Sequence, residues 1–108
     1  MDIKILTKQA EELLDLTENG WVRDIHFDMS KLAEECGEVA ESLNKSRKTN
    51  EDLAEELADV MVVIAIIALK KDIDLEKAII NKQVKRVDKL LKRFHDEKRT
   101  NPTEQISL

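Results

Sequence analysis

Residues 31–69 read KLAEECGEVAESLNKSRKTNEDLAEELADVMVVIAIIAL, in which two carboxylate-bearing segments are followed by ten consecutive apolar residues. On an α-helix, residues three or four positions apart lie on the same face. Glu35 and Glu38 therefore form one pair of neighbouring carboxylates, and Glu56 and Asp59 form a second. Two such helices side by side would gather hard oxygen ligands into a single cluster.

The first carboxylate segment has the pattern of an amphipathic helix. A helical wheel places Glu34, Glu38 and Glu41 opposite one apolar stripe, with Glu35 on the shoulder of that stripe. Taken alone, this is also the pattern of an ordinary solvated acidic face. We expect the stripe to face the core with Cys36 as a small core residue; it comprises Met29, Leu32, Ala33, Cys36, Val39, Ala40 and Leu43.

The second carboxylate segment is harder to explain as a solvated face. Its apolar face is formed by Leu53, Leu57, Val60, Ile64 and Ile67. Glu56 falls within that face and Asp59 lies at its edge. Because an unpaired carboxylate in an apolar environment costs several kcal/mol, Glu56 requires a proton, a paired charge or a metal ion.

A divalent cation would satisfy such a cluster. Carboxylates held close together raise one another's pKa until a cation compensates their charge. Oxygen donors without a Cys or His set favour Mg²⁺, with Mn²⁺ as a possible substitute, over a structural zinc. Because Mg²⁺ held by a few carboxylates keeps positions open for water and phosphate oxygens, we expect a phosphate-bearing substrate.

The composition predicts an all-α protein with one domain. The 108 residues include only two glycines, one proline and three aromatic residues, which suits a sheet poorly. We predict a domain over residues 1–99 and a mobile tail over residues 100–108. The apolar run is far shorter than the roughly 20 residues needed to cross a bilayer. With no signal-peptide pattern at the start, we expect a cytoplasmic protein without a membrane partner.

The charge distribution argues against binding to a nucleic-acid polymer. The formal net charge is −5, yet residues 82–99 contain eight Lys or Arg and three Asp or Glu. An acidic body with one basic helix lacks the broad positive surface of such binders and suits a metal with a small polyanion. The single cysteine, Cys36, excludes an internal disulfide framework.

Four helices are expected. The first covers residues 2–19 and stops at Asn19-Gly20, and the second begins at Asp28 or Ser30 and runs to residue 45. The third covers residues 51–70 with Asn50 as its cap, and the fourth covers residues 75–98 with Asp74 as its cap. Because the third helix is apolar on every side after Asp59, a second copy of the chain should cover it, giving a homodimer or a dimer of dimers.

Three further residues are candidates for substrate contact, each with an alternative. Trp21, in the first linker, either packs over a helix end or stacks on a nucleobase. Lys82 and Arg86, in the basic helix, are either solvated charges or contacts to phosphate beside an acidic metal site.

The carboxylate segments resemble a known family. LAEECGEVAE at residues 32–41, followed by EELADV at residues 55–60, is similar to the E-E-x-x-E and E-x-x-D signature of MazG-type nucleotide pyrophosphohydrolases. The glycine inside the first motif and IDLEKA at residues 73–78 fit as well. The similarity covers about residues 27 to 90.

The resemblance implies an all-α enzyme of helix-bundle subunits that hydrolyses a (deoxy)nucleoside triphosphate to the monophosphate and pyrophosphate. It implies that Mg²⁺ is bound by Glu35, Glu38, Glu56 and Asp59. Glu34 would be the base that activates water, or a ligand of an additional metal. Family members also use a basic residue and an asparagine of the last helix, and here Asn81, Lys82 and Arg86 align with these in more than one register.

Two other functional classes remain open at this point. A non-catalytic helical dimerisation or regulatory module would carry the same acidic faces, merely solvated. A di-iron carboxylate bundle would require Glu-x-x-His pairs. Neither His26 nor His95 has a glutamate three residues before it, so the di-iron hypothesis is the weaker of the two.

Overall fold

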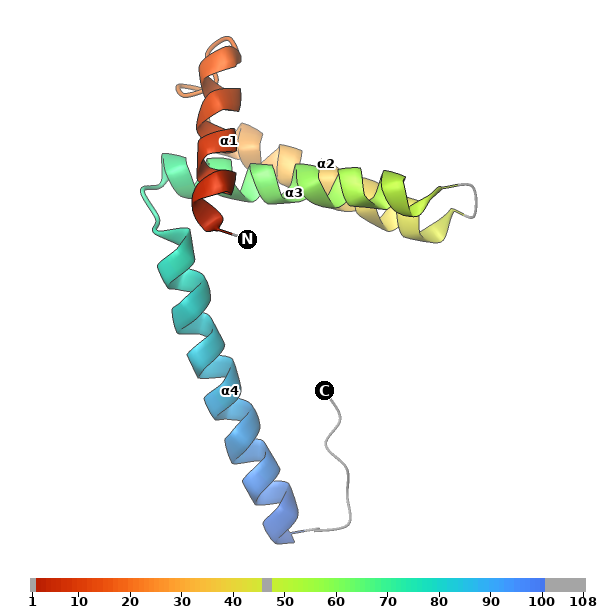
Figure 1. The fold of residues 1–108 in the computed structure, drawn as a ribbon, viewed down its shortest axis with the longest axis vertical. Coiled ribbons are helices and arrows are strands. Elements are labelled where there is room, and N and C mark those ends of the chain that lie inside the picture. The colour runs from red at the N-terminus through yellow and green to blue at the C-terminus, as the bar shows by residue number, and fades with distance from the viewer. Residues whose placement is uncertain (1, 46–47, 101–108) are drawn as a thin grey trace. The chain divides into compact units, whose positions relative to one another are not determined.

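The computed structural model describes residues 2–45 and 48–100, which form four α-helices and no strands (Figure 1). The helices are α1 (Ile3–Leu16), α2 (Ile25–Asn44), α3 (Asn50–Lys70) and α4 (Leu75–Thr100). The all-α prediction is confirmed for these residues. None of the four helices is both long enough and apolar enough, over the described residues, to cross a membrane.

The chain separates into two compact units between Ile73 and Asp74. The first unit contains α1, α2 and α3, and the second contains α4. One domain over residues 1–99 therefore stays a prediction. Of the predicted tail, Thr100 is the last residue of α4, and residues 101–108 lie outside the described residues.

The helix starts follow capping chemistry. The Asp24 side chain accepts a hydrogen bond from the His26 backbone N–H at 2.8 Å, so α2 begins at Ile25 and not at Asp28 or Ser30 as predicted. In α3 the cap is Thr49 in place of Asn50, because Thr49 and Asp52 satisfy each other's backbone N–H groups in a capping box. Asp74 accepts from the Lys77 N–H at 3.0 Å, as predicted for α4.

The end of α1 depends on a tight turn. The helix ends at Leu16, three residues before the predicted end, and Thr17 caps it by donating to the Leu13 carbonyl. Asn19 then adopts a positive φ of 60°. A Cβ on Gly20 would lie 2.6 Å from the Leu14 carbonyl oxygen, so the turn requires glycine there.

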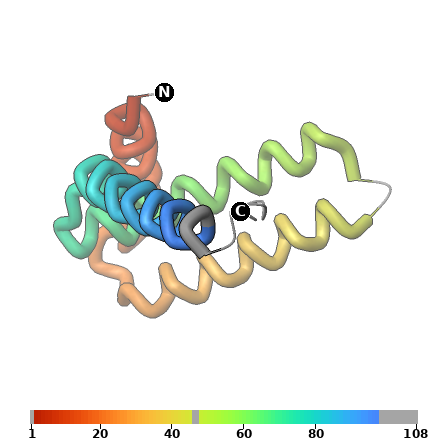
Figure 2. The backbone as a smooth tube through the Cα atoms, turned by 90° about the horizontal axis from the view of Figure 1, so that it is seen from below, coloured from red at the N-terminus to blue at the C-terminus, as the bar shows by residue number. Residues whose placement is uncertain are grey.

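The core of the first unit lies where α1 packs on the C-terminal half of α3. Its buried side chains are Leu6, Ala10, Leu14, Ala65 and Ile66, with Ile3, Val62 and Leu69 packed at its border. α2 lies antiparallel beside α3, as both views of the backbone show (Figures 1 and 2). This pairing brings the two carboxylate segments next to each other.

The predicted orientation of α2 is wrong. Its buried residues are Asp28, Glu35 and Ser42, and Cys36 is exposed instead of lying in the core. Other members of the predicted core stripe are exposed as well: Met29, Ala33, Ala40 and Leu43. A helical wheel locates an apolar stripe but not the neighbour that covers it. In this unit the shoulder of the stripe is buried instead: it carries Asp28, Glu35 and Ser42, with Leu32 and Val39 half-buried beside them.

The predicted apolar face of α3 is also rotated. The side chains that are buried are Val63, Ala65, Ile66 and Ala68, whereas Leu57 is exposed. The last half of α3 is apolar on every side, so a wheel cannot identify the face that meets α1. The packing of α1 selects it.

Candidate metal centre

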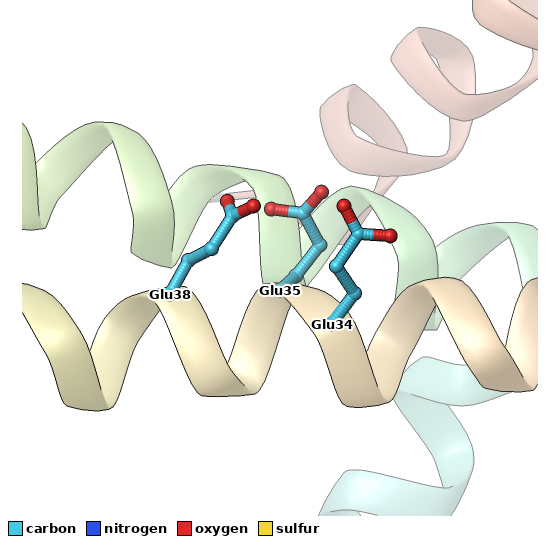
Figure 3. Close-up of side chains that lie close together, drawn as sticks. All are labelled: Glu34, Glu35 and Glu38. Carbon is cyan, nitrogen blue, oxygen red and sulfur yellow. The ribbon is translucent and has the colours of Figure 1, made fainter.

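Five carboxylates meet where α2 and α3 lie side by side. Glu34, Glu35 and Glu38 each offer an oxygen, and these oxygens lie within 4.8 Å of one another. Oxygens of Glu35, Glu56 and Asp59 form a second triplet within the same limit. Figure 3 shows the first triplet on α2, with the Glu35 carboxylate between those of its two neighbours. Because Glu35 belongs to both triplets, the two helices contribute to one cluster.

Burial separates the members of this cluster. Glu35 is buried, Glu38 and Glu56 are half-buried, and Glu34 and Asp59 are exposed. The Oε2 atoms of Glu35 and Glu56 are both shielded from solvent and have no hydrogen-bond partner among the described residues. An orphaned carboxylate oxygen is costly, and a bound cation is one of the few arrangements that would satisfy it. These two oxygens distinguish the cluster from a solvated acidic face.

The carboxyl group of Glu38 holds its proton more firmly than an ordinary glutamate does. The pKa of Glu38 is raised, chiefly because its carboxyl hydrogen-bonds that of Glu56, and further by loss of hydration and the negative charge of Glu56. A hydrogen bond between two carboxyl groups requires that one of them be protonated. A cation bound here would therefore compete with that proton.

The donor set suits Mg²⁺. All the candidate ligand atoms of the two triplets are carboxylate oxygens, with no thiol or imidazole among them. Hard oxygen donors bind Mg²⁺ and Mn²⁺ well, whereas zinc sites usually include sulfur or nitrogen. The residues present therefore fit the predicted cation.

Lys31, which was not predicted as a site residue, lies beside the cluster. Lys31 Nζ lies 3.3 Å from Glu35 Oε1 and 3.7 Å from Glu34 Oε1. A hydrogen bond to Glu35 and the charge of Glu34 raise the pKa of Lys31. The sequence does indicate these pairs, since Lys31 precedes the two glutamates by three and four residues and so lies on the same helix face.

A cavity of about 260 Å³ lies beside the cluster in the first unit. Its wall is mostly apolar, with four polar or charged side chains at α2 and the turn before it. The lining residues are Leu13, Leu14, Thr17, Gly20, Arg23, Phe27, Asp28, Lys31, Val63 and Ile66. Lys31 thus belongs both to the cavity wall and to the edge of the carboxylate cluster.

The N-terminal end of α2 is held by a buried ion pair. Lys70 Nζ donates to Asp28 Oδ2 at 2.7 Å and to the Arg23 carbonyl oxygen at 3.1 Å. Both side chains of the pair are less than a tenth exposed. The Arg23 guanidinium lies 4.3 Å from the centre of the Phe27 ring, a cation–π contact at the cavity wall. These contacts position the cavity wall relative to α3.

The three substrate-contact candidates are not among the residues of the cluster or of the cavity wall. The Trp21 indole N–H donates to Asp15 Oδ1 at 2.7 Å, so the ring is held against the end of α1 while remaining exposed. Lys82 and Arg86 are exposed on α4, in the second unit. Contact of these three side chains with substrate stays a prediction.

A family model matches more than half of the chain. The family model for the MazG nucleotide pyrophosphohydrolase domain matches residues 24–91, which include the cluster, Lys31 and half of the residues that line the cavity. No curated protein and no solved structure matches the chain.

Proposed function

This chain belongs to the MazG nucleotide pyrophosphohydrolase family, and on that basis we propose that it hydrolyses a (deoxy)nucleoside triphosphate to the monophosphate and pyrophosphate. The observation that carries the proposal is the pair of buried, unpartnered oxygens on Glu35 and Glu56. A non-catalytic module with merely solvated acidic faces would have no reason to bury them.

We assign the cation site to Glu35, Glu38, Glu56 and Asp59. Their oxygens fall in the two triplets that share Glu35, and they would hold Mg²⁺, with Mn²⁺ as a substitute. When bound, the cation would neutralise triphosphate charge and lower the pKa of a coordinated water.

Glu34 differs from the other members of the cluster in its surroundings. Its side chain is 59% exposed, and Lys31 is its ion-pair partner. An exposed carboxylate at the edge of the cluster can accept the proton of a water that attacks the α-phosphorus. Glu34 would otherwise serve as a ligand of an additional cation.

The cavity provides a place for the nucleoside. From Asp28 at its wall to Glu35 in the cluster, α2 advances by seven residues, or about 10 Å. A nucleoside in the cavity could therefore place its phosphates at the carboxylates. Trp21, Lys82 and Arg86 are the further side chains that we propose to contact substrate, the first near the base and the other two at phosphate.

The direct test is a panel of NTPs and dNTPs with Mg²⁺, in which pyrophosphate and orthophosphate release are measured separately. We expect pyrophosphate from at least one substrate and none after the cation is chelated with EDTA. Orthophosphate as the first product would contradict attack at the α-phosphorus. If no member of the panel is hydrolysed, the proposal as a whole is contradicted.

Mg²⁺ should raise the melting temperature, and more so at pH 7.5 than at pH 5. A ligand at 100 times its Kd stabilises the fold by about 2.7 kcal/mol, which corresponds to a rise of many degrees in a domain of this size. The raised pKa of Glu38 means that its protonated form stabilises the fold at low pH, and that this contribution is lost as pH rises through that pKa. Mg²⁺ requires the carboxylate, so protons oppose its binding as pH falls.

The measurement is a thermal melt with and without millimolar MgCl₂ at the two pH values. Glu41→Gln is the control, because Glu41 pairs with Lys45 away from the cluster and should keep the wild-type response. A shift of equal size at both pH values would contradict the role of Glu38 as a ligand.

We also propose that the protein is a homo-oligomer, a dimer or a dimer of dimers. The exposed apolar residues of α2, with Leu57 and Met61 of α3, are side chains that a second copy would cover. Light scattering should give a mass of at least twice 12.4 kDa at micromolar concentration. A stable, folded monomer under those conditions would refute the proposal.

A further inference from the structure

Lys31 is placed between the carboxylate cluster and the cavity. Its ammonium group lies 3.3 Å from Glu35 Oε1 and 3.7 Å from Glu34 Oε1, and its side chain also lines the cavity wall. Among the described residues it is the cation that pairs with members of the cluster. A nucleotide with its base in the cavity and its phosphates at the cluster would have to pass this side chain.

The ion pair with Glu35 is unlike an ordinary surface pair. A second lysine–glutamate pair with the same four-residue separation, Glu41 and Lys45, lies further along α2. The two lysine side chains are equally accessible, at 44% and 47% exposed. Their partners differ, since Glu41 is 49% exposed and Glu35 only 8%. Lys31 therefore reaches from solvent to a buried carboxylate whose second oxygen has no partner.

A lysine at Oε1 of Glu35 and a divalent cation at Oε2 would compete for the charge of one carboxylate. Both would take charge from Glu35, and at such short separation in a partly buried site two cations repel each other strongly. Arrival of the divalent cation should therefore free the Lys31 ammonium from Glu35. Its flexible stem of four methylene groups allows it to turn to another anion without movement of the helix.

We propose that Lys31 is a movable counter-ion: it neutralises Glu35 and Glu34 in the empty site, and it transfers to a phosphate oxygen of the nucleotide when the divalent cation binds. The inference rests on the proposed function, because it takes the ligand to be a nucleoside triphosphate. Lys31 is then a substrate-binding residue whose partner depends on the state of the site.

One substitution should change the affinities for Mg²⁺ and for nucleotide in opposite directions. Lys31→Met keeps most of the apolar stem of the side chain but removes the charge. Without nucleotide, Mg²⁺ should bind this variant several-fold more tightly than the wild type, because a competitor for Glu35 is gone. With Mg²⁺ present, a non-hydrolysable triphosphate analogue should bind about tenfold more weakly, because a charge-assisted contact to phosphate is lost.

Both affinities can be measured by titration calorimetry on the whole chain. Lys45→Met is the matched control and should leave both values unchanged, since Glu41 lies outside the cluster. Lys31→Arg keeps the charge and should restore most of the affinity for the analogue. In steady-state assays, Lys31→Met should raise KM more than it lowers kcat. Circular dichroism of each variant would establish that the fold is retained.

The outcomes separate this inference from the proposed function. If Mg²⁺ affinity, or the affinity for the analogue, is the same in Lys31→Met as in Lys45→Met, the movable counter-ion is wrong even where the wild type releases pyrophosphate. If the wild type releases none from any triphosphate, the proposed function fails. In that case the movable counter-ion is contradicted as well only if the two titrations give the same affinities for Lys31→Met and for the control Lys45→Met.

Discussion

Glu56→Gln is expected to abolish pyrophosphate release, with a loss of more than about a hundredfold. Substitution of a residue that only hydrogen-bonds a metal ligand typically lowers metal affinity or activity by about 10–100-fold. We propose that Glu56 is a ligand itself, so its substitution should cost more. Its Oε2 is buried and unpartnered, and it shares a triplet with Glu35 and Asp59. The fold should remain intact or become more stable, because the amide removes one repelling charge from the cluster.

Matched variants make this test specific. Glu41→Gln changes the same functional group on α2, at an exposed residue that pairs with Lys45, and should retain activity. Asp59→Asn should behave as Glu56→Gln does. Purified variants would be compared by rate of pyrophosphate release and by Mg²⁺ titration. Equal activity in Glu56→Gln and Glu41→Gln would exclude the site as assigned.

Glu34 is distinguished from the ligands by the same two measurements. If Glu34 is the base, Glu34→Gln lowers turnover and leaves Mg²⁺ affinity largely unchanged. If it is a ligand of an additional cation, the substitution weakens cation binding as well.

Lys70→Met should destabilise the fold by about 3–5 kcal/mol, the usual effect of removing one partner of a buried ion pair. Lys70 holds both Asp28 and the Arg23 carbonyl oxygen, and the pair is almost inaccessible to solvent. Loss of the ammonium group would leave the Asp28 carboxylate buried without its counter-charge. The N-terminal end of α2 would then lose its main polar attachment to α3.

Urea unfolding measures this effect, with Lys71→Met as the control. Lys71 is the adjacent residue but is exposed, so its substitution should change the free energy of unfolding by less than about 0.5 kcal/mol. Combining Lys70→Met with Asp28→Leu should recover much of the loss, because no unpaired charge then remains. Equal stability of the Lys70 and Lys71 variants would show that the pair contributes nothing.

Local spacing was sufficient to predict much of this protein. The few glycines and aromatic residues and the helical periodicity predict four helices, and the starts and ends differ from the predictions by only a few residues. Glu35 with Glu38, and Glu56 with Asp59, can be paired from the sequence because a helix places such neighbours on one face. The need of Glu56 for a partner is also visible, since its neighbours on the wheel are apolar. The same spacing rule also places Lys31 beside Glu34 and Glu35.

The relations between helices could not be obtained in this way. Asp28 and Lys70 pair across 42 residues, and no periodicity within either helix indicates that contact. The same holds for the burial of Glu35, which depends on the face that α2 turns toward α3. A wheel ranks the faces of one helix by polarity alone, whereas packing depends on the groups that a neighbour offers. The carboxylates, their spacing and the expectation of one cluster thus came from the sequence, while the shielding of two of its oxygens from water arose only from the packing of α2 on α3.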